Sequence, residues 1–286
     1  PDNKTDITAP DAPANLTIAE TRTTGIVLEW EAPVKDGGSP ITGYVIEQAS
    51  PAGSDFTAVD NIGATKTTYD NVGLTPETEY VYRVKAINEK GESEPSNTAV
   101  ATTLSEADRR DIARVEIYLN SFSSLKGQFL QQSSSGHLAE GWLYLSRPNQ
   151  VRLDYRPPSS LQIYADGYWL AYVDTELEEV THVPLSSTPV GFLVREQVRL
   201  SGEVNVLRVE RDIGVIRLHV VQTEEPETGR VVLTLQDPPM RLSHWTVIDG
   251  HGVKTRVSLL DAQYNLGLDE KLFEFDGSKF DQPETP

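Results

Sequence analysis

Cysteine is absent from the 286 residues of the chain, which excludes disulfide scaffolds, thiolate zinc sites and cysteine nucleophiles together. Basic residues are also scarce, since 25 Lys and Arg stand against 43 Asp and Glu and leave a net charge of −18. Such an acidic chain is repelled by nucleic acid, so we expect no nucleic-acid partner. No stretch approaches the ~18 apolar residues of a membrane span, and no signal peptide is visible. We expect either a cytosolic protein or the processed form of an exported one.

Motifs of catalysis and metal binding are also missing. The five histidines show neither His-x-x-x-His nor His-Glu-x-x-His spacing, which favours surface histidines over a metal site. No Gly-x-Ser-x-Gly elbow, phosphate loop or dinucleotide fingerprint is present. The carboxylate pairs Glu178-Glu179 and Glu224-Glu225 flank predicted turns and are interpreted as solvated charge. We therefore expect no enzyme activity, no catalytic residues, no metal site and no cofactor.

Length and composition predict two folded domains. A usual domain has roughly 100–200 residues, and the 38% hydrophobic content of this chain is enough for two cores. We expect a flexible lead-in at 1–12, a first domain at 13–104 and a second domain at 105–286. Residues 1–104 hold 7 basic and 16 acidic residues and the rest hold 18 and 27, so each part carries −9. The acidity belongs to both domains and indicates solubility and avoidance of anionic membranes rather than one charged partner.

The first domain has the pattern of a β-sandwich. Seven short alternating runs are separated by turn residues such as Asp36-Gly37-Gly38, with no helical stretch. Trp30 is the large aromatic side chain best able to fill the middle of a two-sheet core.

Four motifs carry a resemblance over this whole segment: Pro13-Ala14-Asn15-Leu16, Trp30, the run from Asp36 to Tyr44, and the run from Leu74 to Asn88. With them, residues 13–103 resemble a fibronectin type III module. The resemblance implies an immunoglobulin-like β-sandwich in which Tyr80 forms a tyrosine corner, its hydroxyl satisfying upstream backbone. We interpret the module as a spacer or display element, because no Arg-Gly-Asp loop is present. Adhesion through its loops is the alternative.

The second domain begins with a predicted helix and continues as strands. Ile112, Val115, Leu119 and Phe122 recur at helical spacing, and Ser105 is a predicted N-cap with Asp108 as its acidic partner. Strand alternation then dominates, most clearly at 216–220. One further short helix is predicted at 187–196, with Thr188 as N-cap and Pro189 at the first helical position. The terminal residues 275–286 are predicted to be a frayed tail.

Ordered sequence blocks characterise this domain: Ile112–Asn120 with Leu125–Gln131, Glu140–Tyr155, Ala165-Asp166-Gly167, Ser187-Thr188-Pro189 and Leu272–Phe275. Through their order and spacing, residues 105–280 resemble the periplasmic lipoprotein-carrier family LolA, particularly its α-proteobacterial type. The resemblance implies an open antiparallel half-barrel, covered by helices, whose apolar cavity takes the acyl chains of lipoproteins. It also implies a monomer in the periplasm, with its signal peptide removed. Its implied partners are acylated lipoproteins, an inner-membrane ABC exporter and an outer-membrane acceptor.

The resemblance also implies roles for individual residues. Arg147 matches an arginine on the concave side that hydrogen-bonds to the lid, and its parity with Leu143 and Leu145 agrees with that face. An arginine there needs carbonyl or carboxylate partners, which the C-terminal end of a covering helix offers. The alternative is that Pro148 breaks the strand and leaves Arg147 solvated in a turn.

Further site residues follow from the same comparison. The lid is predicted at 188–194, including Thr188, Pro189 and Val190, with an ordinary core helix as the alternative. The predicted cavity-lining residues, each of which core packing explains equally well, are Leu143, Leu145, Leu153, Phe192 and Leu193. Val151 stands where family members often have an aromatic residue associated with contacting the exporter, so we place the exporter contact near 147–153.

Two other functions remain open from the sequence. Envelope-stress sensors share the half-barrel but typically append a second domain after it, and here the chain ends soon after Phe280. That favours the carrier. A surface-adhesion protein acting through the type III module is the other alternative, and it predicts binding to a matrix ligand without bound acyl chains. A complete type III module directly before the carrier helix is unexpected for the family, and we interpret it as a natural or an engineered fusion.

Overall fold

The chain folds into two compact units. A computed structural model describes residues 7–51, 53–223 and 229–275, and its contacts separate residues 1–110 from residues 111–286. The join predicted at 104–105 lies a few residues earlier, where helix α1 (Glu106–Leu119) begins. Among the described residues, no helix has both the length and the apolar character that crossing a membrane requires.

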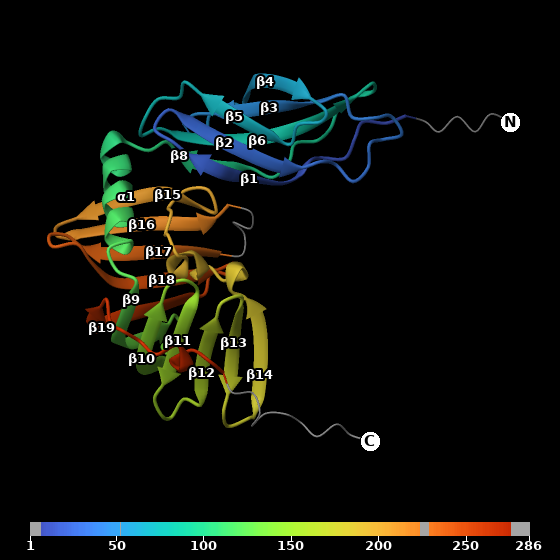
Figure 1. The fold of residues 1–286 in the computed structure, drawn as a ribbon. Coiled ribbons are helices and arrows are strands. Elements are labelled where there is room, and N and C mark those ends of the chain that lie inside the picture. The colour runs from blue at the N-terminus through green and yellow to red at the C-terminus, as the bar shows by residue number, and fades with distance from the viewer. Residues whose placement is uncertain (1–6, 52, 224–228, 276–286) are drawn as a thin grey trace, which may run out of the picture. The chain divides into compact units, whose positions relative to one another are not determined.

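The first unit is a sandwich of two antiparallel sheets (Figure 1). One sheet has the order β1-β2-β5, and the other has the order β4-β3-β6, with β7 and β8 both paired to β6. The strands are β1 (Ala14–Thr21), β2 (Gly25–Glu31), β3 (Gly43–Ala49), β4 (Thr57–Gly63), β5 (Thr68–Val72), β6 (Glu79–Asn88), β7 (Gly91–Glu92) and β8 (Ala99–Thr102). All seven predicted strands are present, and the two-residue β7 adds to them.

Aromatic side chains fill the interior of the sandwich. Trp30 is 2% exposed and packs edge-on against Tyr44, with ring centroids 5.4 Å apart. The backbone N–H of Thr75 donates to the hydroxyl of Tyr80 over 3.0 Å, which is the tyrosine corner that the sequence predicts. The core of this unit is therefore packed around Trp30.

The second unit is one open sheet of eleven antiparallel strands in the order β14-β13-β12-β11-β10-β9-β19-β18-β17-β16-β15. The strands are β9 (Ser124–Ser133), β10 (Leu138–Ser146), β11 (Gln150–Tyr155), β12 (Leu161–Asp166), β13 (Trp169–Asp174), β14 (Glu179–Pro184), β15 (Val204–Asp212), β16 (Val215–Gln222), β17 (Gly229–Gln236), β18 (Arg241–Asp249) and β19 (Lys254–Tyr264). Two meanders meet where β9 pairs with β19. In the described part of the chain, the outermost strands β14 and β15 do not pair, so the sheet is not closed into a barrel.

The connection at 185–203 has to cross one face of this sheet. It leaves β14 at one edge and enters β15 at the opposite edge, ten strand spacings away. At about 4.8 Å per spacing the flat sheet would be about 48 Å wide, and about 20 residues at up to ~3.4 Å each reach about 68 Å, which is enough to cross it. The topology therefore lays this connection over the sheet as a cover, visible in gold in Figure 1.

Helix α1 is a second cover. Ser105 and Asp108 form the predicted capping box: the N–H of Asp108 donates to the Ser105 hydroxyl at 2.9 Å, and the N–H of Ser105 donates to the Asp108 carboxylate at 2.8 Å. Val115 and Leu119 are buried in the core of the second unit. The helix ends at Leu119, so the prediction that Phe122 lies on the same helical face is wrong. Phe122 is buried, but it follows the helix in a turn.

The short helix predicted at 187–196 is also wrong. The segment forms two 3₁₀ turns, η1 (Leu185–Ser187) and η2 (Gly191–Val194). Thr188 is not an N-cap, because its hydroxyl donates to the carbonyl of Leu185 at 2.7 Å instead of accepting from the next turn. Four backbone bonds from residue 185 to residue 195 join residues three apart, including Leu193 N to Val190 O at 3.0 Å. A 3₁₀ turn rises about 2.0 Å per residue against about 1.5 Å in an α-helix, so it takes up less of the length of the crossing.

Candidate binding cavity

A cavity of about 440 Å³ lies between the sheet of the second unit and its covering segments. The volume falls within the range of about 300–1,000 Å³ that is usual for ligand pockets. We call the face of the sheet that carries Leu143, Val151, Ile163, Leu170 and Trp245 the inner face, because these side chains line the cavity. The opposite face is the outer face.

Alternate residues of seven strands form the wall on the sheet side. Strand alternation brings every second side chain to the same face, so each strand contributes two or three of them. These lining residues are Leu125 and Gln131 of β9, Leu143 and Leu145 of β10, Val151, Leu153 and Tyr155 of β11, Leu161 and Ile163 of β12, Leu170 and Tyr172 of β13, Leu242, Trp245 and Val247 of β18, and Thr255, Val257 and Leu259 of β19.

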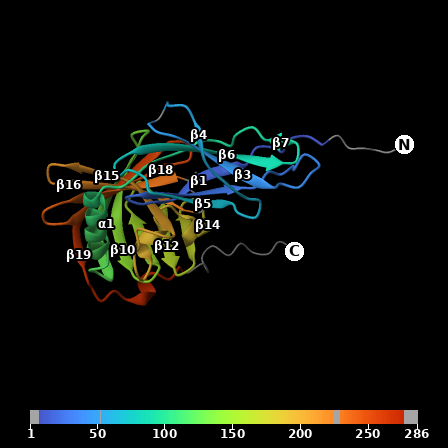
Figure 2. The same cartoon turned by 90° about the horizontal axis from the view of Figure 1, so that it is seen from above.

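The covering wall comes from the end of α1 and from the crossing segment. It consists of Leu119, Phe122, Leu185, Thr188, Pro189, Val190, Leu193 and Val194. Figure 2 shows the helix and the strands of this unit from a second direction. Hydrogen bonds hold the crossing segment in place: the N–H of Asn149 donates to Val194 O at 2.7 Å, and the Gln222 amide donates to the Ser186 and Thr188 carbonyls at 2.8 and 3.1 Å.

The lining is almost entirely apolar. Among the described lining residues, Arg147 is the only one with a formal charge. The main polar pair is Tyr155 and Gln131, and these satisfy each other because the Tyr155 hydroxyl donates to the Gln131 side-chain oxygen at 2.7 Å. Burial raises the pKa of Tyr155 to about 12, so the phenol stays neutral. The arrangement suits an apolar ligand and offers few groups for a polar one.

Arg147 connects the sheet to both covers. Its guanidinium donates to the carbonyls of Leu119 and of Phe122, the latter at 2.8 Å, and to Leu193 O from both Nη2 at 2.9 Å and Nε at 3.2 Å. Leu119 is the last residue of α1, where the helix dipole favours a cation. Leu193 belongs to η2, in the crossing segment. We call the predicted role of Arg147, hydrogen bonding from the sheet to the lid, the latch hypothesis. The contacts that this hypothesis requires are present.

The electrostatic setting of Arg147 is unusual. Its guanidinium carbon lies 4.8 Å from the centre of the Phe122 ring, and no carboxylate among the described residues forms an ion pair with it. Burial lowers the pKa of Arg147 to about 10, which still leaves it charged at neutral pH. The alternative places Arg147 in a turn with a solvated side chain. Its first part agrees with the structure, because β10 ends at Ser146, but the side chain points inward and lines the cavity.

The predicted cavity-lining residues lie in the cavity wall with one exception. Leu143, Leu145, Leu153 and Leu193 line it, as do the predicted lid residues Thr188, Pro189 and Val190. Phe192 is 6% exposed and belongs to the core, but it is not among the lining residues. The 3₁₀ turn explains this, because with about three residues per turn Val190 and Leu193 share a face that Phe192 does not.

Val151 faces the cavity. It is 8% exposed and projects from β11 on the inner face, beside Leu153. A side chain in this position contacts a ligand inside the cavity, and not a protein bound to the outer surface. Its contact with an exporter remains a prediction.

Part of the cavity wall was not predicted. Ile163, Leu170 and Tyr172 of β12 and β13 line the cavity as well, as do Trp245 of β18 and Val257 of β19 on the same inner face. The alternation of β18 and β19 is visible in the sequence and marks these residues as one face of a strand. Alternation does not tell which face of which strand borders an empty space.

On the outer face, the late block Leu272–Phe275 covers strands β11 and β12. Phe273 is 1% exposed, and Phe275 packs against Tyr164 with ring centroids 5.5 Å apart. The guanidinium of Arg152 donates to Leu272 O at 3.0 Å and pairs with Asp154 at 2.7 Å. This block therefore has a packing role on the side of the sheet away from the cavity.

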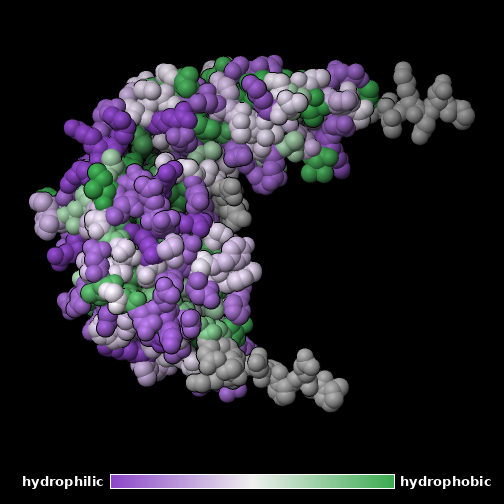
Figure 3. All heavy atoms as spheres, in the orientation of Figure 1, coloured by the Kyte–Doolittle hydropathy of each residue, from purple (hydrophilic) through white to green (hydrophobic). Residues whose placement is uncertain are grey.

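Potential metal-ligating groups are dispersed over the described residues. No three His, Asp or Glu side chains among them are grouped as metal ligands would be. Glu178 and Glu179 are exposed, as expected for solvated charge, whereas Glu224-Glu225 and the tail after Phe275 lie outside the described residues. The face of the second unit seen in Figure 3 is largely hydrophilic.

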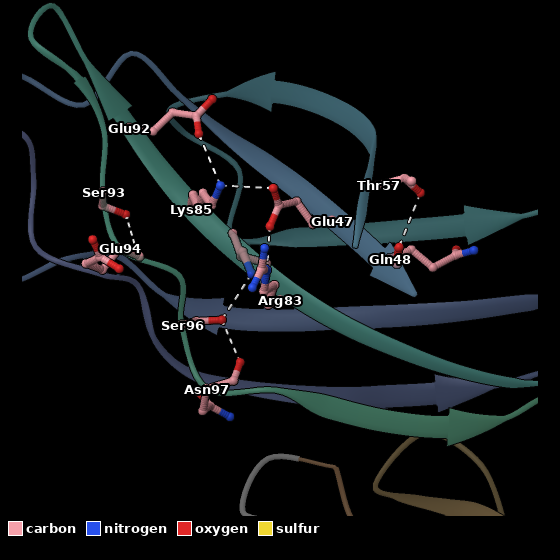
Figure 4. A network of polar contacts seen from close by, with 11 residues as sticks. Glu47, Gln48, Thr57, Arg83, Lys85, Glu92, Ser93, Glu94, Ser96 and Asn97 are labelled. Atoms are coloured by element: carbon pink, nitrogen blue, oxygen red, sulfur yellow. Dashed lines mark hydrogen bonds and ion pairs between the residues drawn. The ribbon is translucent and has the colours of Figure 1, made fainter. Parts of the chain in front are cut away.

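The first unit has a polar network of its own, on β3, β6 and β7 (Figure 4). Glu47 pairs with Arg83 and, at 2.9 Å, with Lys85, and Lys85 also lies 3.3 Å from Glu92. Burial opposes ionisation of Glu47, but the hydrogen bonds from Lys85 and Arg83 prevail and lower its pKa below the ordinary value. These charges are satisfied within the unit.

Comparison with known proteins identifies two families, one in each unit. Residues 120–276, more than half of the chain, match the family described as outer membrane lipoprotein carrier protein LolA. Residues 11–102 match the fibronectin type III domain.

Individual relatives align with part of the chain. Titin of Drosophila melanogaster is 37% identical over 92 residues, which is 32% of this chain and a share of titin that rounds to 0%. Protein sax-3 of Caenorhabditis elegans is 34% identical over 174 residues, 57% of this chain and 12% of that protein. The chain thus spans a small part of these relatives. A crystal structure of domains A168–A170 from titin, 30% identical, matches 34% of this chain and 33% of its own with a TM-score of 0.32.

Proposed function

The chain belongs to the outer membrane lipoprotein carrier family LolA, and from this premise we propose that it carries acylated lipoproteins through the periplasm. In this proposal it receives them from an inner-membrane ABC exporter, holds their acyl chains in the cavity and passes them to an outer-membrane acceptor. No chemical step is involved. The observation that carries the proposal is the apolar cavity of about 440 Å³ whose only charged lining residue, among those described, is Arg147.

The energetics of acyl chains require such a cavity. Each methylene exposed to water costs about 0.8 kcal/mol, so one long chain costs on the order of 10 kcal/mol. A wall built from leucine, isoleucine, valine and aromatic side chains offsets most of that cost. A carrier with this wall alone would hold its cargo too tightly to deliver it. Release therefore needs an interaction that stabilises the unloaded protein.

In this proposal, Arg147 supplies the interaction that stabilises the unloaded protein. Its hydrogen bonds to Leu119, Phe122 and Leu193 fasten the covers to the sheet in the unloaded molecule. A bond to a charged group contributes about 1.5–3 kcal/mol. Cargo that pushes the covers apart breaks these bonds, and their re-formation favours departure of the cargo. Arg147 thus acts as a positioning residue that balances loading against release.

The test is cargo uptake by the full chain. The protein is incubated with membranes that contain a triacylated lipoprotein, and the soluble fraction is analysed by native mass spectrometry with lipid extraction. We expect a stoichiometric complex that retains the acyl chains. A second unit that stays free of ligand and never takes up acylated cargo would falsify the carrier function.

A matched pair of variants assigns uptake to the cavity. Leu153→Trp puts a larger side chain into the cavity from the inner face of β11. Tyr144→Trp, on the neighbouring strand β10, places the same side chain on the outer face. We expect uptake to fall in the first variant and to persist in the second. Equal uptake by both would mean that the cargo is held elsewhere.

For the first unit we propose a spacer or display role. The support is that the charges of Glu47, Arg83, Lys85 and Glu92 are satisfied among themselves. Removal of residues 1–104 should therefore leave cargo uptake unchanged, and loss of uptake would show that the module takes part in it.

A further inference from the structure

The outer face of strands β15–β19 carries a cluster of basic side chains. We call Arg208, Arg217, Arg230, Lys254 and Arg256 the basic face. Strand alternation assigns them to the outer side, because their neighbours Ile216, Leu218, Val231 and Val257 are buried in the core on the inner side. Arg208, Arg230, Lys254 and Arg256 are exposed, and Arg217 is half-buried.

Strand register brings these residues into three adjacent rows. The first row runs across all five strands from Arg208 on β15 to Arg256 on β19. Within it, Arg208 pairs with His219 on β16, and Arg256 pairs with Thr246 on β18. The second row contains Glu210 opposite Arg217. In the third row, Arg230 and Lys254 lie on either side of Ile248, which pairs with both. Four strand spacings and two steps along the strands give the array about 19 Å by about 13 Å.

The basic face differs from several other basic side chains of the second unit. Some of those are paired with carboxylates: Arg114 with Asp111 and Asp237, Arg152 with Asp154, and Arg156 with Glu140. On the basic face, Glu210 pairs with Arg208 at 3.2 Å and contacts His219 at the same distance. Among the described residues, no carboxylate forms an ion pair with Arg217, Arg230, Lys254 or Arg256.

Two histidines lie within this array. Burial, and after it the charges of Arg256 and Arg217, lower the pKa of His244 below its ordinary value. Burial also lowers the pKa of His219, against the attraction of Glu210. Both rings are therefore neutral at pH 7, and the charge of the face at that pH comes from its arginine and lysine side chains.

We propose that the basic face docks the protein on an anionic lipid surface, with headgroup phosphates meeting Arg217, Arg230, Lys254 and Arg256. This inference concerns the outer face and does not depend on the cavity or its cargo. The net charge of −18 does not prevent such contact, because salt screens charges beyond a Debye length of about 8–10 Å. The acidic residues of the chain keep other faces away and so orient the approach.

The shape of the array favours a lipid surface over an acidic polypeptide. An extended peptide runs along one line, whereas these cations come from four of the five neighbouring strands β15–β19 and lie in three rows. A membrane offers phosphates in two dimensions. A basic residue near an anionic bilayer increases affinity by about fivefold. Four such residues without carboxylate partners are enough for reversible binding.

Co-sedimentation with lipid vesicles tests the inference on the full chain. Vesicles of phosphatidylcholine are compared with vesicles that contain equal parts phosphatidylcholine and phosphatidylglycerol. The low-salt buffer has an ionic strength of about 0.1 M, with a Debye length of about 10 Å, and the high-salt buffer one of about 1 M, with a Debye length of about 3 Å. We expect binding only to the anionic vesicles and only at low salt. The double variant Arg217→Gln, Arg256→Gln should lower the affinity on the order of 30-fold.

A charge-matched control separates the face from net charge. Arg110→Gln, Arg199→Gln removes two exposed arginines from α1 and from the crossing segment, and it should bind as the unaltered protein does. Equal loss in both double variants would overturn the inference, as would equal binding to neutral vesicles or binding that resists salt. Displacement by a polyglutamate peptide that binds more tightly than the anionic vesicles would also overturn it, in favour of an acidic protein partner.

Discussion

The two units of this chain are both built from antiparallel strands, but one core is filled and the other is hollow. In the first unit Trp30 occupies the interior at 2% exposure, edge-on to Tyr44. In the second unit Trp245 belongs to the wall of a cavity of about 440 Å³. A filled core contributes to stability and leaves no space for a ligand. The hollow core gives up some of that packing and gains a place for an apolar guest.

The largest effect is expected from Trp30→Ala. Its indole N–H has no hydrogen-bond partner in the described structure, so the residue serves through its bulk. We expect the free energy of unfolding of the first unit to fall by about 3–5 kcal/mol, as for other buried Trp→Ala changes. Chemical denaturation followed by circular dichroism measures it. A loss below about 1 kcal/mol would contradict the description of a filled core.

The next effect concerns the connection between sheet and covers. Arg147→Leu should leave the fold intact, because leucine suits the apolar surroundings, while the carbonyls of Leu119, Phe122 and Leu193 lose their donor. Losing about 1.5–3 kcal/mol of charged hydrogen bonding corresponds to release of cargo slowed by on the order of tenfold or more.

The rate of release is measured as the rate at which the protein transfers a bound acylated lipoprotein to acceptor membranes. Arg147→Lys keeps the charge but not the forked donor, and we expect it to be intermediate. If Arg147→Leu transferred cargo at the rate of the unaltered protein, the latch hypothesis would be abandoned.

Trp245→Ala is the counterpart of Trp30→Ala in the hollow core. Trp245 is half-buried and already borders empty space, so fewer contacts are lost. We expect the free energy of unfolding of the second unit to fall by about 1–2 kcal/mol, less than half the effect of Trp30→Ala. The same denaturation experiment measures both variants. Equal losses of unfolding free energy would mean that Trp245 is packed as fully as Trp30 and does not border an empty space.

The smallest effect is expected at His244, which lies outside both cores. Its folded pKa is lowered by burial, so the unfolded chain takes up the proton first. The stability that this histidine contributes is therefore complete above its unfolded pKa of about 6.5 and is lost as the pH falls from there to the folded pKa.

His244→Gln removes this dependence. We expect the variant to lose less stability between pH 7 and pH 5 than the unaltered protein, as measured by urea denaturation at each pH. His251→Gln, at an exposed turn, serves as the control and should change nothing. A steeper pH dependence in His244→Gln would show that the sign of the shift is wrong.

Local patterns predicted most of the fold. Seven alternating runs became seven strands of the first unit, and Ser105 with Asp108 became a capping box because that motif depends on residues only three apart. Predictions for 187–196 were wrong because Thr188 and Pro189 carry a local helix signal that the long crossing overrides. Phe122 was misplaced because apolar spacing continues past the point where α1 ends.

The candidate site was predicted in part, because strand parity is a local pattern, whereas the arrangement of segments around the cavity is not. Leu143, Leu145 and Arg147 share a strand face by parity alone, so their common direction was visible in the sequence. Phe192 was assigned to the cavity because hydrophobicity does not distinguish the two sides of a 3₁₀ turn. The basic face was hidden because Arg208, Arg217, Arg230, Lys254 and Arg256 come from four strands, and only their register brings them together.

The sequence by itself determined the two-unit organisation, the strand patterns, the filled core around Trp30 and the absence of cysteine chemistry, since all of these follow from composition and from neighbours a few residues apart. Tertiary structure alone decided where the second core remains empty and what closes it. Strands β14 and β15 lie at opposite edges, so the segment 185–203 must cross the inner face. Only that crossing brings the carbonyl of Leu193 to Arg147, 46 residues away in the chain.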